Sequence, residues 1–329
     1  MQNQDNIDNI YNIIGYLGGG GLSKVYRVRN TNNNTEYAAK IRIRNVNNFQ
    51  QELQMTTNAS NLNNPNIIHL NNHGIGTIAR GGHVRNNMNY LIIDYYSKGD
   101  LFKYIHIGRL SERHAKFIFR KILNGIRALH GAGICHRDLK LENILLDQNF
   151  NPKISDFVFS TLFQANNEII QLHDILGTIS YMPPQMFNHQ PYNGSKADIF
   201  SLGVILFNLV TGIRGFNEAK INDKFYRYIL NNHINEYWNN LPNEINNFNL
   251  SQEFKDLYIR MVSFNENNRP TIDQILNDIW FNDLVALNNA QLNQLENEVR
   301  NEFLARENQI QNIQLEDNLE DEENVDNAN

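Results

Sequence analysis

One short window of this 329-residue chain carries the side chains that a phosphoryl transfer would need. The window reads His136-Arg137-Asp138-Leu139-Lys140-Leu141-Glu142-Asn143, and Asp156 follows thirteen residues after its end. Phosphoryl transfer requires little covalent chemistry from a protein, but it needs an acceptor for the hydroxyl proton, magnesium ligands and positive charge near the moving phosphate. Asp138 could accept the proton and Lys140 could neutralise charge. Asn143 and Asp156 could hold the metal ion.

A glycine-rich segment near the N-terminus is a second pattern with chemical meaning, and it reads Leu17-Gly18-Gly19-Gly20-Gly21-Leu22-Ser23-Lys24-Val25. Residues 11–28 predict a strand, a glycine turn and a second strand, because apolar and aromatic residues are flanked by turn formers. Glycines lack side chains, so the backbone N–H groups of such a turn can approach phosphates closely. We therefore expect a nucleotide loop between two strands.

These motifs resemble those of eukaryotic protein kinases, and they occur in the order of that family from about residue 11 to residue 281. Other segments that resemble family landmarks are the strand lysine (37–40), the hinge (90–96), the end of the activation segment (177–185) and large-lobe motifs (198–203 and 268–271). The resemblance implies an α+β, two-lobed protein kinase fold. A small β-rich lobe would extend to about residue 93, and a larger α-helical lobe would span residues 97–281.

The resemblance also implies which residues do the chemistry and which bind ATP and Mg²⁺. The implied catalytic residues are Asp138, Lys140, Asn143 and Thr178. The implied ATP-binding residues are Leu17, Gly18, Gly19, Gly20, Gly21, Leu22, Ser23, Lys24, Val25, Ala38, Lys40, Glu52, Asp94, Tyr96, Asp100, Leu145 and Asp156. Asn143 and Asp156 would hold the metal. Ile93 would be the gatekeeper residue at the back of the nucleotide site.

The acidic partner of Lys40 follows from elimination, because Glu52 is the only acidic residue between Glu36 and Asp94. Its distance from Lys40 along the chain is shorter than the family's usual spacing. Alignment backward from residues 64–68 would instead place Met55 at this position, one helical turn later. Positions 52 and 55 share a helix face, so we expect Glu52 to be the partner. The alternative is a solvent-exposed Glu52 on a displaced helix.

Three positions depart from the family pattern in ways that would affect regulation and stability. Ser23 replaces the third glycine of the loop, which could reduce its flexibility. Val158 replaces the glycine of the magnesium motif, and a β-branched residue resists positive φ, so movement of this segment should be restricted. Gln185 replaces the glutamate that relatives pair with an arginine, here Arg269, so a hydrogen bond would replace an ion pair.

Asp174 occupies the position at which many relatives carry a phosphorylated threonine. Its carboxylate could pair with Arg137 and partly replace a phosphate, although with less charge and fewer acceptor oxygens. This interpretation predicts activity without phosphorylation of the loop. The alternative is a solvated loop aspartate.

Lys140, two residues after Asp138, and Thr178, after Gly177, resemble the serine/threonine branch of the family, and the core resembles the calmodulin-dependent and AMP-activated kinase group. The implied activity is transfer of the ATP γ-phosphate to protein serine or threonine. A pseudokinase or nucleotide-binding scaffold is the alternative that Val158, Ser23 and Gln185 would favour. A small-molecule kinase is a third option, which residues 177–185 oppose.

Substrate preference follows only from the resemblance. Glu142 and Asp100 resemble positions that attract basic residues upstream of the acceptor, and Phe159 resembles the pattern that favours serine over threonine.

Composition excludes several other classes of protein. The net charge is −6 and no basic run occurs, so we expect no nucleic-acid partner. The most apolar segment, residues 200–210, is too short for a bilayer and predicts a buried core helix. One cysteine, Cys135, excludes an internal disulfide, and the polar residues 1–11 contain no signal region. We expect an intracellular, cytoplasmic protein that does not bind membranes.

The regions outside residues 11–281 are an N-terminal extension, residues 1–10, and a C-terminal segment. Within residues 282–315, apolar residues recur at three- and four-residue steps and predict an amphipathic helix, namely Leu292, Leu295, Val299, Phe303, Ile310 and Ile313. Arg306 interrupts this stripe. The helix could dock on the large lobe, mediate self-association or stand alone in solvent. Residues 316–329 are acidic and apolar-poor, which predicts disorder.

Calmodulin-binding helices are basic, whereas residues 283–315 contain only Arg300 and Arg306 as cations. Direct control by calmodulin is therefore not expected.

Overall fold

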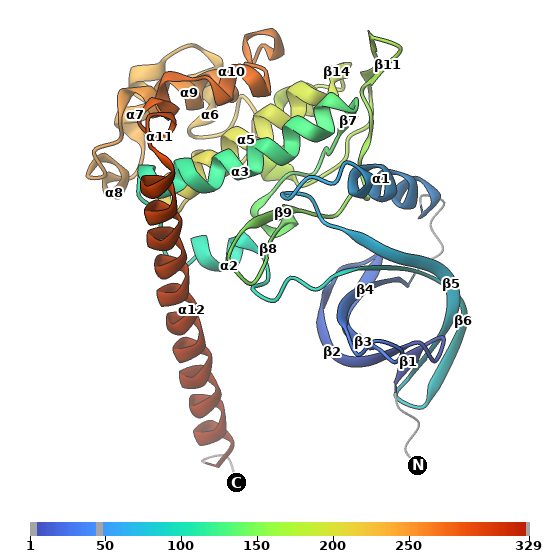
Figure 1. The fold of residues 1–329 in the computed structure, drawn as a ribbon. Helices are drawn as coiled ribbons and strands as arrows, with labels where there is room; N and C mark the ends of the chain where they lie inside the picture. Colours follow the sequence, from blue (N-terminus) through green and yellow to red (C-terminus); the bar gives the residue numbers. More distant parts are fainter. Residues whose placement is uncertain (1–4, 44–48, 327–329) are drawn as a thin grey trace.

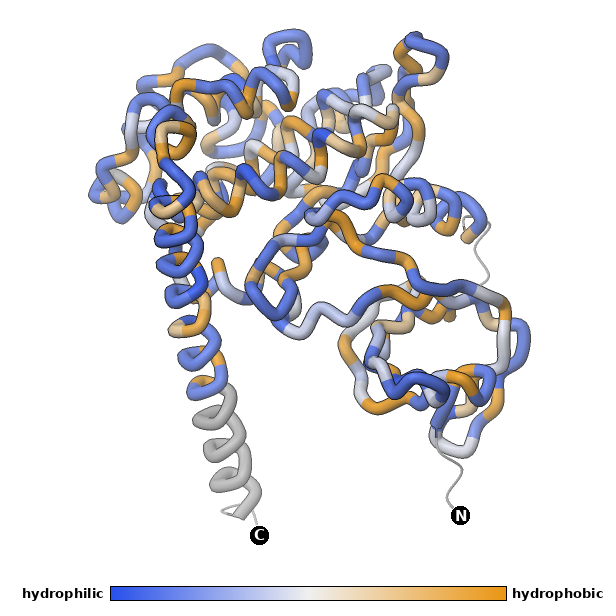
Figure 2. Tube along the Cα trace, viewed as in Figure 1, coloured by the Kyte–Doolittle hydropathy of each residue, from blue (hydrophilic) through white to orange (hydrophobic). Residues whose placement is uncertain are grey.

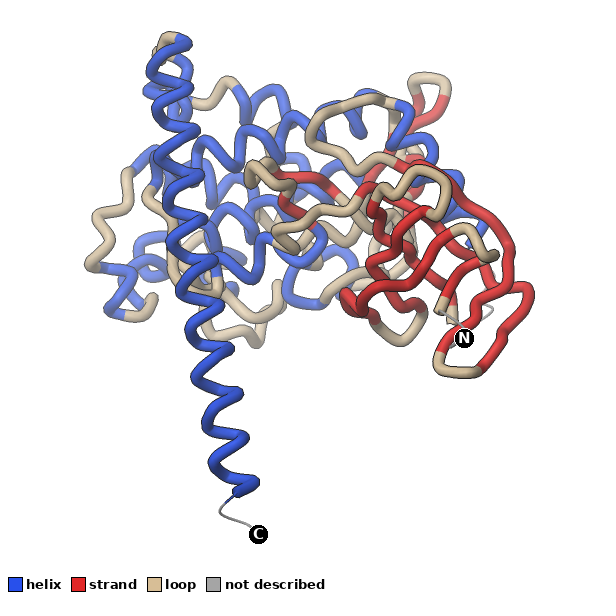
Figure 3. The backbone as a smooth tube through the Cα atoms, turned by 60° about the horizontal axis from the view of Figure 1, so that its bottom comes forward, coloured by secondary structure: helices blue, strands red, loops and turns tan. Residues whose placement is uncertain are grey.

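The computed structural model describes residues 5–43 and 49–326, and the chain folds into two lobes (Figure 1). The strands gather in the small lobe and the helices in the large lobe (Figure 3). The expected α+β architecture is therefore confirmed. The chain passes from the small lobe to the large lobe between Asp94, which ends β6, and Leu101, which begins α2.

The small lobe is a closed antiparallel barrel with the strand order β1-β2-β3-β4-β6-β5. Its elements are β1 (Asn6–Ile7), β2 (Tyr11–Gly19), β3 (Ser23–Asn30), β4 (Glu36–Arg42), α1 (Phe49–Asn61), β5 (Leu70–Arg80) and β6 (His83–Asp94). Alternate residues of each strand point inward, so Val28 and Ile92 are fully buried. The predicted strand, glycine turn and strand correspond to β2 and β3.

The N-terminal extension, residues 1–10, contributes a strand to this barrel. β1 pairs with both β2 and β5, and Ile7 is fully buried. The carboxylate of Asp8 accepts hydrogen bonds from Thr77 N–H at 2.6 Å and from Tyr90 O–H at 3.1 Å. Two residues of strand give no periodic signal in a polar sequence, so only the pairing with β2 and β5 reveals this element. Residues 1–4 lie outside the described part of the chain.

The large lobe is built around helices and also contains short two-stranded sheets. Its helices are α2 (Leu101–Ile105), α3 (Glu112–Gly131), α4 (Pro184–Phe187), α5 (Gly194–Thr211), α6 (Tyr226–Leu230), α7 (Ile234–Asn240), α8 (Asn243–Asn246), α9 (Gln252–Met261), α10 (Ile272–Leu276), α11 (Asn282–Val285) and α12 (Asn289–Asp326). The strand pairs are β7 (Ile134–Cys135) with β10 (Thr161–Leu162), β8 (Ile144–Leu146) with β9 (Pro152–Ile154), β11 (Gln164–Ala165) with β12 (Glu168–Ile169), and β13 (Gln171–Leu172) with β14 (Tyr192–Asn193). The 3₁₀ turns are η1 (Leu141–Asn143), η2 (Ile179–Tyr181), η3 (Glu266–Asn268) and η4 (Ile279–Phe281).

Helix α5 forms the centre of the large lobe, as its continuous run of hydrophobic residues predicts (Figure 2). It begins at the N-cap Asn193, whose side chain accepts from Ser195 N–H, and it ends at Gly212 with φ 77°. Among the described residues it is the one helix with the length and hydropathy of a membrane span, but 89% of it is buried inside the protein. The prediction of a buried core helix for residues 200–210 is therefore confirmed.

Helix α12 docks on the large lobe, which is one of the three alternatives left open for the C-terminal helix. Leu295, Val299, Phe303 and Ile310 are buried against the lobe. The chain's own lobe therefore covers these four side chains of the predicted stripe, whereas Ile313 remains 40% exposed.

The disorder predicted for residues 316–329 is wrong as far as Asp326, because α12 continues to that residue. Leu, Gln and Glu favour helix, and extending a helix that is already nucleated by packing requires only one residue at a time. Residues 327–329 lie outside the described part of the chain.

Candidate active site

A cavity of about 630 Å³ opens between the two lobes and collects most of the predicted nucleotide-site residues. The predicted residues that line it are Leu17, Gly18, Gly19, Gly20, Ser23, Val25, Ala38, Lys40, Glu52, Ile93, Asp94, Tyr96, Asp100, Lys140, Asn143, Leu145 and Asp156. Gly21, Leu22 and Lys24 do not line it. Side chains alternate along β3, so Ser23 and Val25 face the cavity while Lys24 is exposed on the other face.

Several lining residues were not predicted as nucleotide-binding residues, and most of them are neighbours of motif residues: Thr56, Ile68, Leu91, Tyr95, Ser97, Lys98, Gly99, Lys103, Glu142, Ser155 and Phe157. Thr56 lies four residues after Glu52, so helical periodicity could have indicated it. The others come from loops and strands whose register is fixed only by the fold.

The glycine loop joins β2 to β3 as a tight hairpin. Gly20 N–H donates to the carbonyl oxygen of Ser23 at 3.0 Å. A Cβ atom added to Gly19 would lie 2.6 Å from that same carbonyl oxygen. The position therefore requires glycine, and the backbone forms the roof of the cavity.

Three charged groups meet at the back of the cavity. Lys40 Nζ lies 2.8 Å from Glu52 Oε1 and 2.7 Å from Asp156 Oδ1. Burial alone would lower the pKa of Lys40, but Asp156 and Glu52 outweigh burial and hold the pKa above its ordinary value. The structure thus pairs Lys40 with Glu52, while Met55 is buried in the apolar core.

Arg42 is a second cation for Glu52 that sequence reasoning missed. Its Nη2 lies 2.6 Å from Glu52 Oε2, and both side chains are almost completely buried. The contact lacks hydrogen-bond alignment, and Arg42 Nε and Nη1 have no hydrogen-bond partner among the described residues. Arg42 lies two residues after Lys40 on β4, hence on the same face of the strand, a spacing that could have indicated it.

The predicted catalytic residues form one hydrogen-bonded cluster around Asp138. Thr178 Oγ1 donates to Asp138 Oδ1 at 2.7 Å, and Lys140 Nζ lies 3.0 Å from Asp138 Oδ2. Lys140 also donates to Thr178 Oγ1 at 2.8 Å. Asn143 Nδ2 donates to the Asp138 carbonyl at 2.8 Å. Lys140 and Asn143 line the cavity, so this cluster lies at its edge.

The backbone of the catalytic loop is held from below by Asp198 of α5. This buried carboxylate accepts from His136 N–H and from Arg137 N–H, each at 2.8 Å. Arg137 has φ 66°, a conformation that non-glycine residues adopt only when their surroundings enforce it. The two hydrogen bonds supply that constraint and so fix the direction of Asp138.

The magnesium motif has its own constrained geometry. Asp156 has φ 65°, and Phe157 is buried beside the His136 ring with the centroids 5.3 Å apart. Val158 is not among the non-glycine residues with positive φ in the described part of the chain. Valine is therefore compatible with this conformation, and it would resist one that needed positive φ at the same position.

The oxygen atoms available near Asn143 and Asp156 suit magnesium. Asn143 uses its Nδ2 for Asp138, which leaves Oδ1 as an acceptor, and Asp156 supplies a carboxylate to the same cavity. No group of three or more His, Cys, Asp or Glu side chains that could hold a metal occurs in the described residues. Two protein oxygens fit a Mg²⁺ ion whose remaining ligands are water and substrate phosphates.

The departures at Asp174 and Gln185 are both accommodated by direct contacts. Arg137 Nη1 lies 3.1 Å from Asp174 Oδ2. Arg269 Nη2 donates to Gln185 Oε1 at 2.7 Å, and Gln185 Nε2 donates to the Phe264 carbonyl. Burial lowers the pKa of Arg269 to about 10, because the neutral amide does not offset the cost of burying its charge.

Comparison with known proteins places this arrangement in a family. The sequence profile of the protein kinase domain matches residues 11–281. CBL-interacting protein kinase 10 of Oryza sativa subsp. japonica is 30% identical over 89% of this chain, and CBL-interacting serine/threonine-protein kinase 15 of Arabidopsis thaliana is 30% identical over 85%. CBL-interacting serine/threonine-protein kinase 26 of Arabidopsis thaliana is 35% identical over 58% of the chain. The matched regions span 61%, 63% and 42% of these relatives, in that order.

This chain therefore belongs to the protein kinase family, and it is related to that family's serine/threonine kinases.

Proposed function

We propose that this protein is a magnesium-dependent serine/threonine kinase that transfers the γ-phosphate of ATP to protein hydroxyl groups. The observation that carries the proposal is the Asp138, Thr178 and Lys140 cluster at the edge of the cavity that Lys40 and Asp156 also line. One group that can accept a proton and two ammonium groups that can neutralise phosphate charge thus converge on one cleft.

Each residue has a role in this mechanism. Asp138 accepts the proton of the acceptor hydroxyl, and Thr178 fixes the orientation of its carboxylate. Lys140 and Lys40 stabilise negative charge on the phosphates, and Glu52 holds Lys40 in place. Bound Mg²⁺, held by Asn143 and Asp156, would neutralise further phosphate charge.

Phosphate transfer to a generic protein substrate tests the proposal, with Asp138→Asn as the matched control. The purified wild type should transfer radioactive label from γ-labelled ATP in the presence of Mg²⁺. The Asp138→Asn variant should lose about 10²–10⁴-fold of that rate, the usual contribution of a general base, while it still binds ATP. Wild-type protein that binds ATP but labels no polypeptide, itself included, would instead be a nucleotide-binding scaffold.

We further propose a preference for substrates with basic residues upstream of serine. Glu142 and Asp100 both line the cavity, and Glu142 Oε2 is buried without a hydrogen-bond partner among the described residues. A buried, unpaired carboxylate oxygen favours an incoming cation. A positional peptide array should show selection for arginine or lysine, and the Glu142→Gln variant should lose it. Acidic or proline-directed selection would contradict this preference.

A further inference from the structure

Helix α12 contributes an aromatic side chain to the region below the nucleotide cavity. The ring of Phe303 stacks on Phe150, at the β8–β9 turn, with the centroids 5.4 Å apart. It also meets Tyr104 of α2 edge-on, with the centroids 5.3 Å apart. Aromatic pairs of this kind contribute beyond the area that they bury. Phe303 therefore joins α12 to two elements adjacent to the cavity.

Arg306 anchors the same turn of α12 through backbone carbonyls rather than through a hydrophobic contact. Its guanidinium donates to the carbonyls of Tyr104 at 2.8 Å and Arg109 at 2.6 Å, and also to that of Gly108. These carbonyls lie at and just beyond the C-terminal end of α2, where helical carbonyls lack intrahelical partners. The residue that interrupts the apolar stripe thus fixes the position of α2.

Glu307 connects α12 directly to the cavity wall. Its Oε2 lies 2.7 Å from Lys98 Nζ, and both side chains are largely buried. Lys98 lines the cavity two residues before Asp100. Tyr104 O–H donates to the Lys98 carbonyl at 3.0 Å. Tyr104 therefore holds the backbone of Lys98, and Glu307 holds its side chain.

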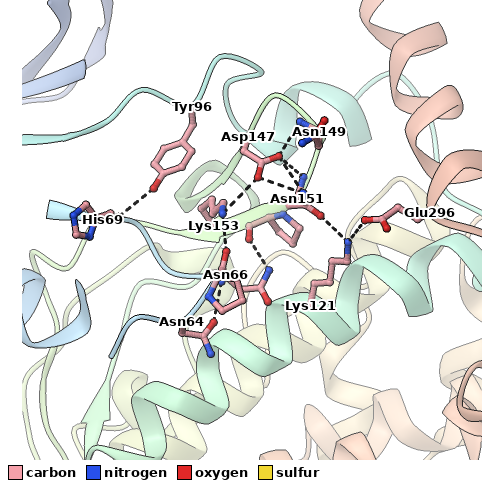
Figure 4. Close-up of polar contacts among 12 residues, drawn as sticks. Asn64, Asn66, His69, Tyr96, Lys121, Asp147, Asn149, Asn151, Lys153 and Glu296 are labelled. Atoms are coloured by element: carbon pink, nitrogen blue, oxygen red, sulfur yellow. Dashed lines mark hydrogen bonds and ion pairs between the residues drawn. The ribbon is translucent and has the colours of Figure 1, made fainter. Parts of the chain in front are cut away.

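A second route joins α12 to the same region through the β8–β9 turn (Figure 4). Lys121 of α3 donates to Glu296 of α12 at 2.7 Å and to Asn151 at 2.6 Å. Asn151 N–H donates to Asp147 Oδ1 at 2.9 Å, and Asp147 lies 3.5 Å from Lys153. The turn that carries Phe150 is thereby held from both sides.

We propose that residues Phe303, Arg306 and Glu307, which we call the α12 brace, position the floor of the nucleotide site. Glu307 is a positioning residue, because it acts on ATP through Lys98 and the following Gly99 and Asp100. This inference rests on the proposed binding of ATP in the cavity. A preorganised site binds its ligand more tightly because less ordering remains to be done on binding. Loss of the brace should therefore weaken ATP binding without changing the chemical step.

The test compares Glu307→Gln and Phe303→Leu with Glu298→Gln as the matched control. Glu298 is also an acidic residue of α12, but the basic side chains that face it, Arg113 and His114 of α3, are each 3.9 Å away. Isothermal titration calorimetry with ATP and Mg²⁺ gives the dissociation constant without reference to activity. Steady-state kinetics gives KM for ATP and kcat, and thermal unfolding of the nucleotide-free proteins reports stability.

Glu307→Gln should weaken ATP binding and raise KM for ATP by about fivefold, at the lower end of the coupling between linked sites. kcat at saturating ATP and KM for the protein acceptor should be unchanged, and Glu298→Gln should match the wild type. In a Lys98→Gln background Glu307→Gln should have no further effect, because both substitutions break the same pair.

A purely structural role for α12 predicts a different result. Brace variants that unfold at lower temperature but bind ATP as tightly as the wild type would overturn the proposal, as would additive effects of Lys98→Gln and Glu307→Gln. If the wild type bound no ATP, the proposed function would fail together with the brace. If the wild type and the brace variants bound ATP equally tightly, only the brace would fail, so the two outcomes can be distinguished.

Discussion

The carboxylate of Asp174 lies 3.1 Å from the guanidinium of Arg137, and this pair joins the activation segment, residues 156–185, to the catalytic loop. Arg137 is almost completely buried, whereas the Asp174 side chain is 66% exposed. Tyr192 O–H also donates to the Asp174 carbonyl at 2.9 Å. Residues 162–177 contain no Ser, Thr or Tyr, so nothing in that stretch could receive a phosphate in place of this contact.

We therefore expect activity in protein that has never been phosphorylated. Asp174→Ala should lower kcat by up to about fivefold, because an exposed ion pair contributes ~0.2–1 kcal/mol. Glu168→Ala is the matched control, since Glu168 is an exposed acidic residue of the same segment. Turnover of Asp174→Ala equal to that of the wild type would show that Asp174 is only a solvated loop residue.

Lys40 and Arg42 share Glu52, and this sharing predicts a non-additive pair of substitutions. Lys40→Met should abolish phosphate transfer but cost little unfolding free energy, since Arg42 still compensates the buried carboxylate. The double variant Lys40→Met/Arg42→Met should lose about 3–5 kcal/mol, the cost of an uncompensated buried charge. Chemical denaturation of the wild type, both single variants and the double variant measures the coupling. Additive losses would mean that Arg42 does not stabilise Glu52.

Thr178 is expected to act through Asp138 and not through ATP. Thr178→Val keeps the shape of the side chain but removes the hydrogen bonds to Asp138 and Lys140. kcat should fall about tenfold or more, by part of the general-base contribution, with KM for ATP unchanged. Thr178→Ser, which keeps the hydroxyl, is the control and should retain most activity. Equal kcat values for the valine and serine variants would exclude this role.

Gln185 should stabilise the large lobe through its two hydrogen bonds. Gln185→Ala would leave Arg269 without its side-chain acceptor and the Phe264 carbonyl without the amide donor, at a cost of about 1–3 kcal/mol. Gln190→Ala, at an exposed glutamine nearby, should have almost no effect. Denaturant titration measures the free energy of unfolding. Equal losses for Gln185→Ala and Gln190→Ala would contradict a stabilising role of the Gln185 side chain.

The docking of α12 should weaken in acid. Burial alone would raise the pKa of Glu302, but hydrogen bonds and charges from His114 and Arg306 outweigh burial and lower the net pKa. A carboxyl with a lowered pKa stabilises the folded state above its unfolded pKa, about 4.3 for glutamate, and loses that contribution as pH falls through the folded pKa. The stability difference between the wild type and Glu302→Gln should therefore be full at neutral pH and shrink toward pH 3. If this stability difference instead grew as the pH fell, the ionised Glu302 carboxylate would not stabilise the folded state.

The sequence alone determined the family, the two-lobed fold and the identity of most residues around the cleft. Each motif needs fixed residue types at fixed local spacing. The roles of Asp138, Lys140 and Asn143 could therefore be predicted from a window of eight residues, 136–143. Glu52 could be predicted for a similar reason, because no other acidic residue was available in its segment.

The tertiary structure decided everything that depends on contacts between distant segments. The position of β1 in the barrel follows from pairing with strands that lie far along the chain, and two residues carry no pattern of their own. The buried Arg306 interrupts an apolar stripe in the sequence, yet it is satisfied by carbonyls at the end of α2, about 200 positions earlier. Long-range hydrogen bonds leave no local periodicity, so only the folded chain reveals them.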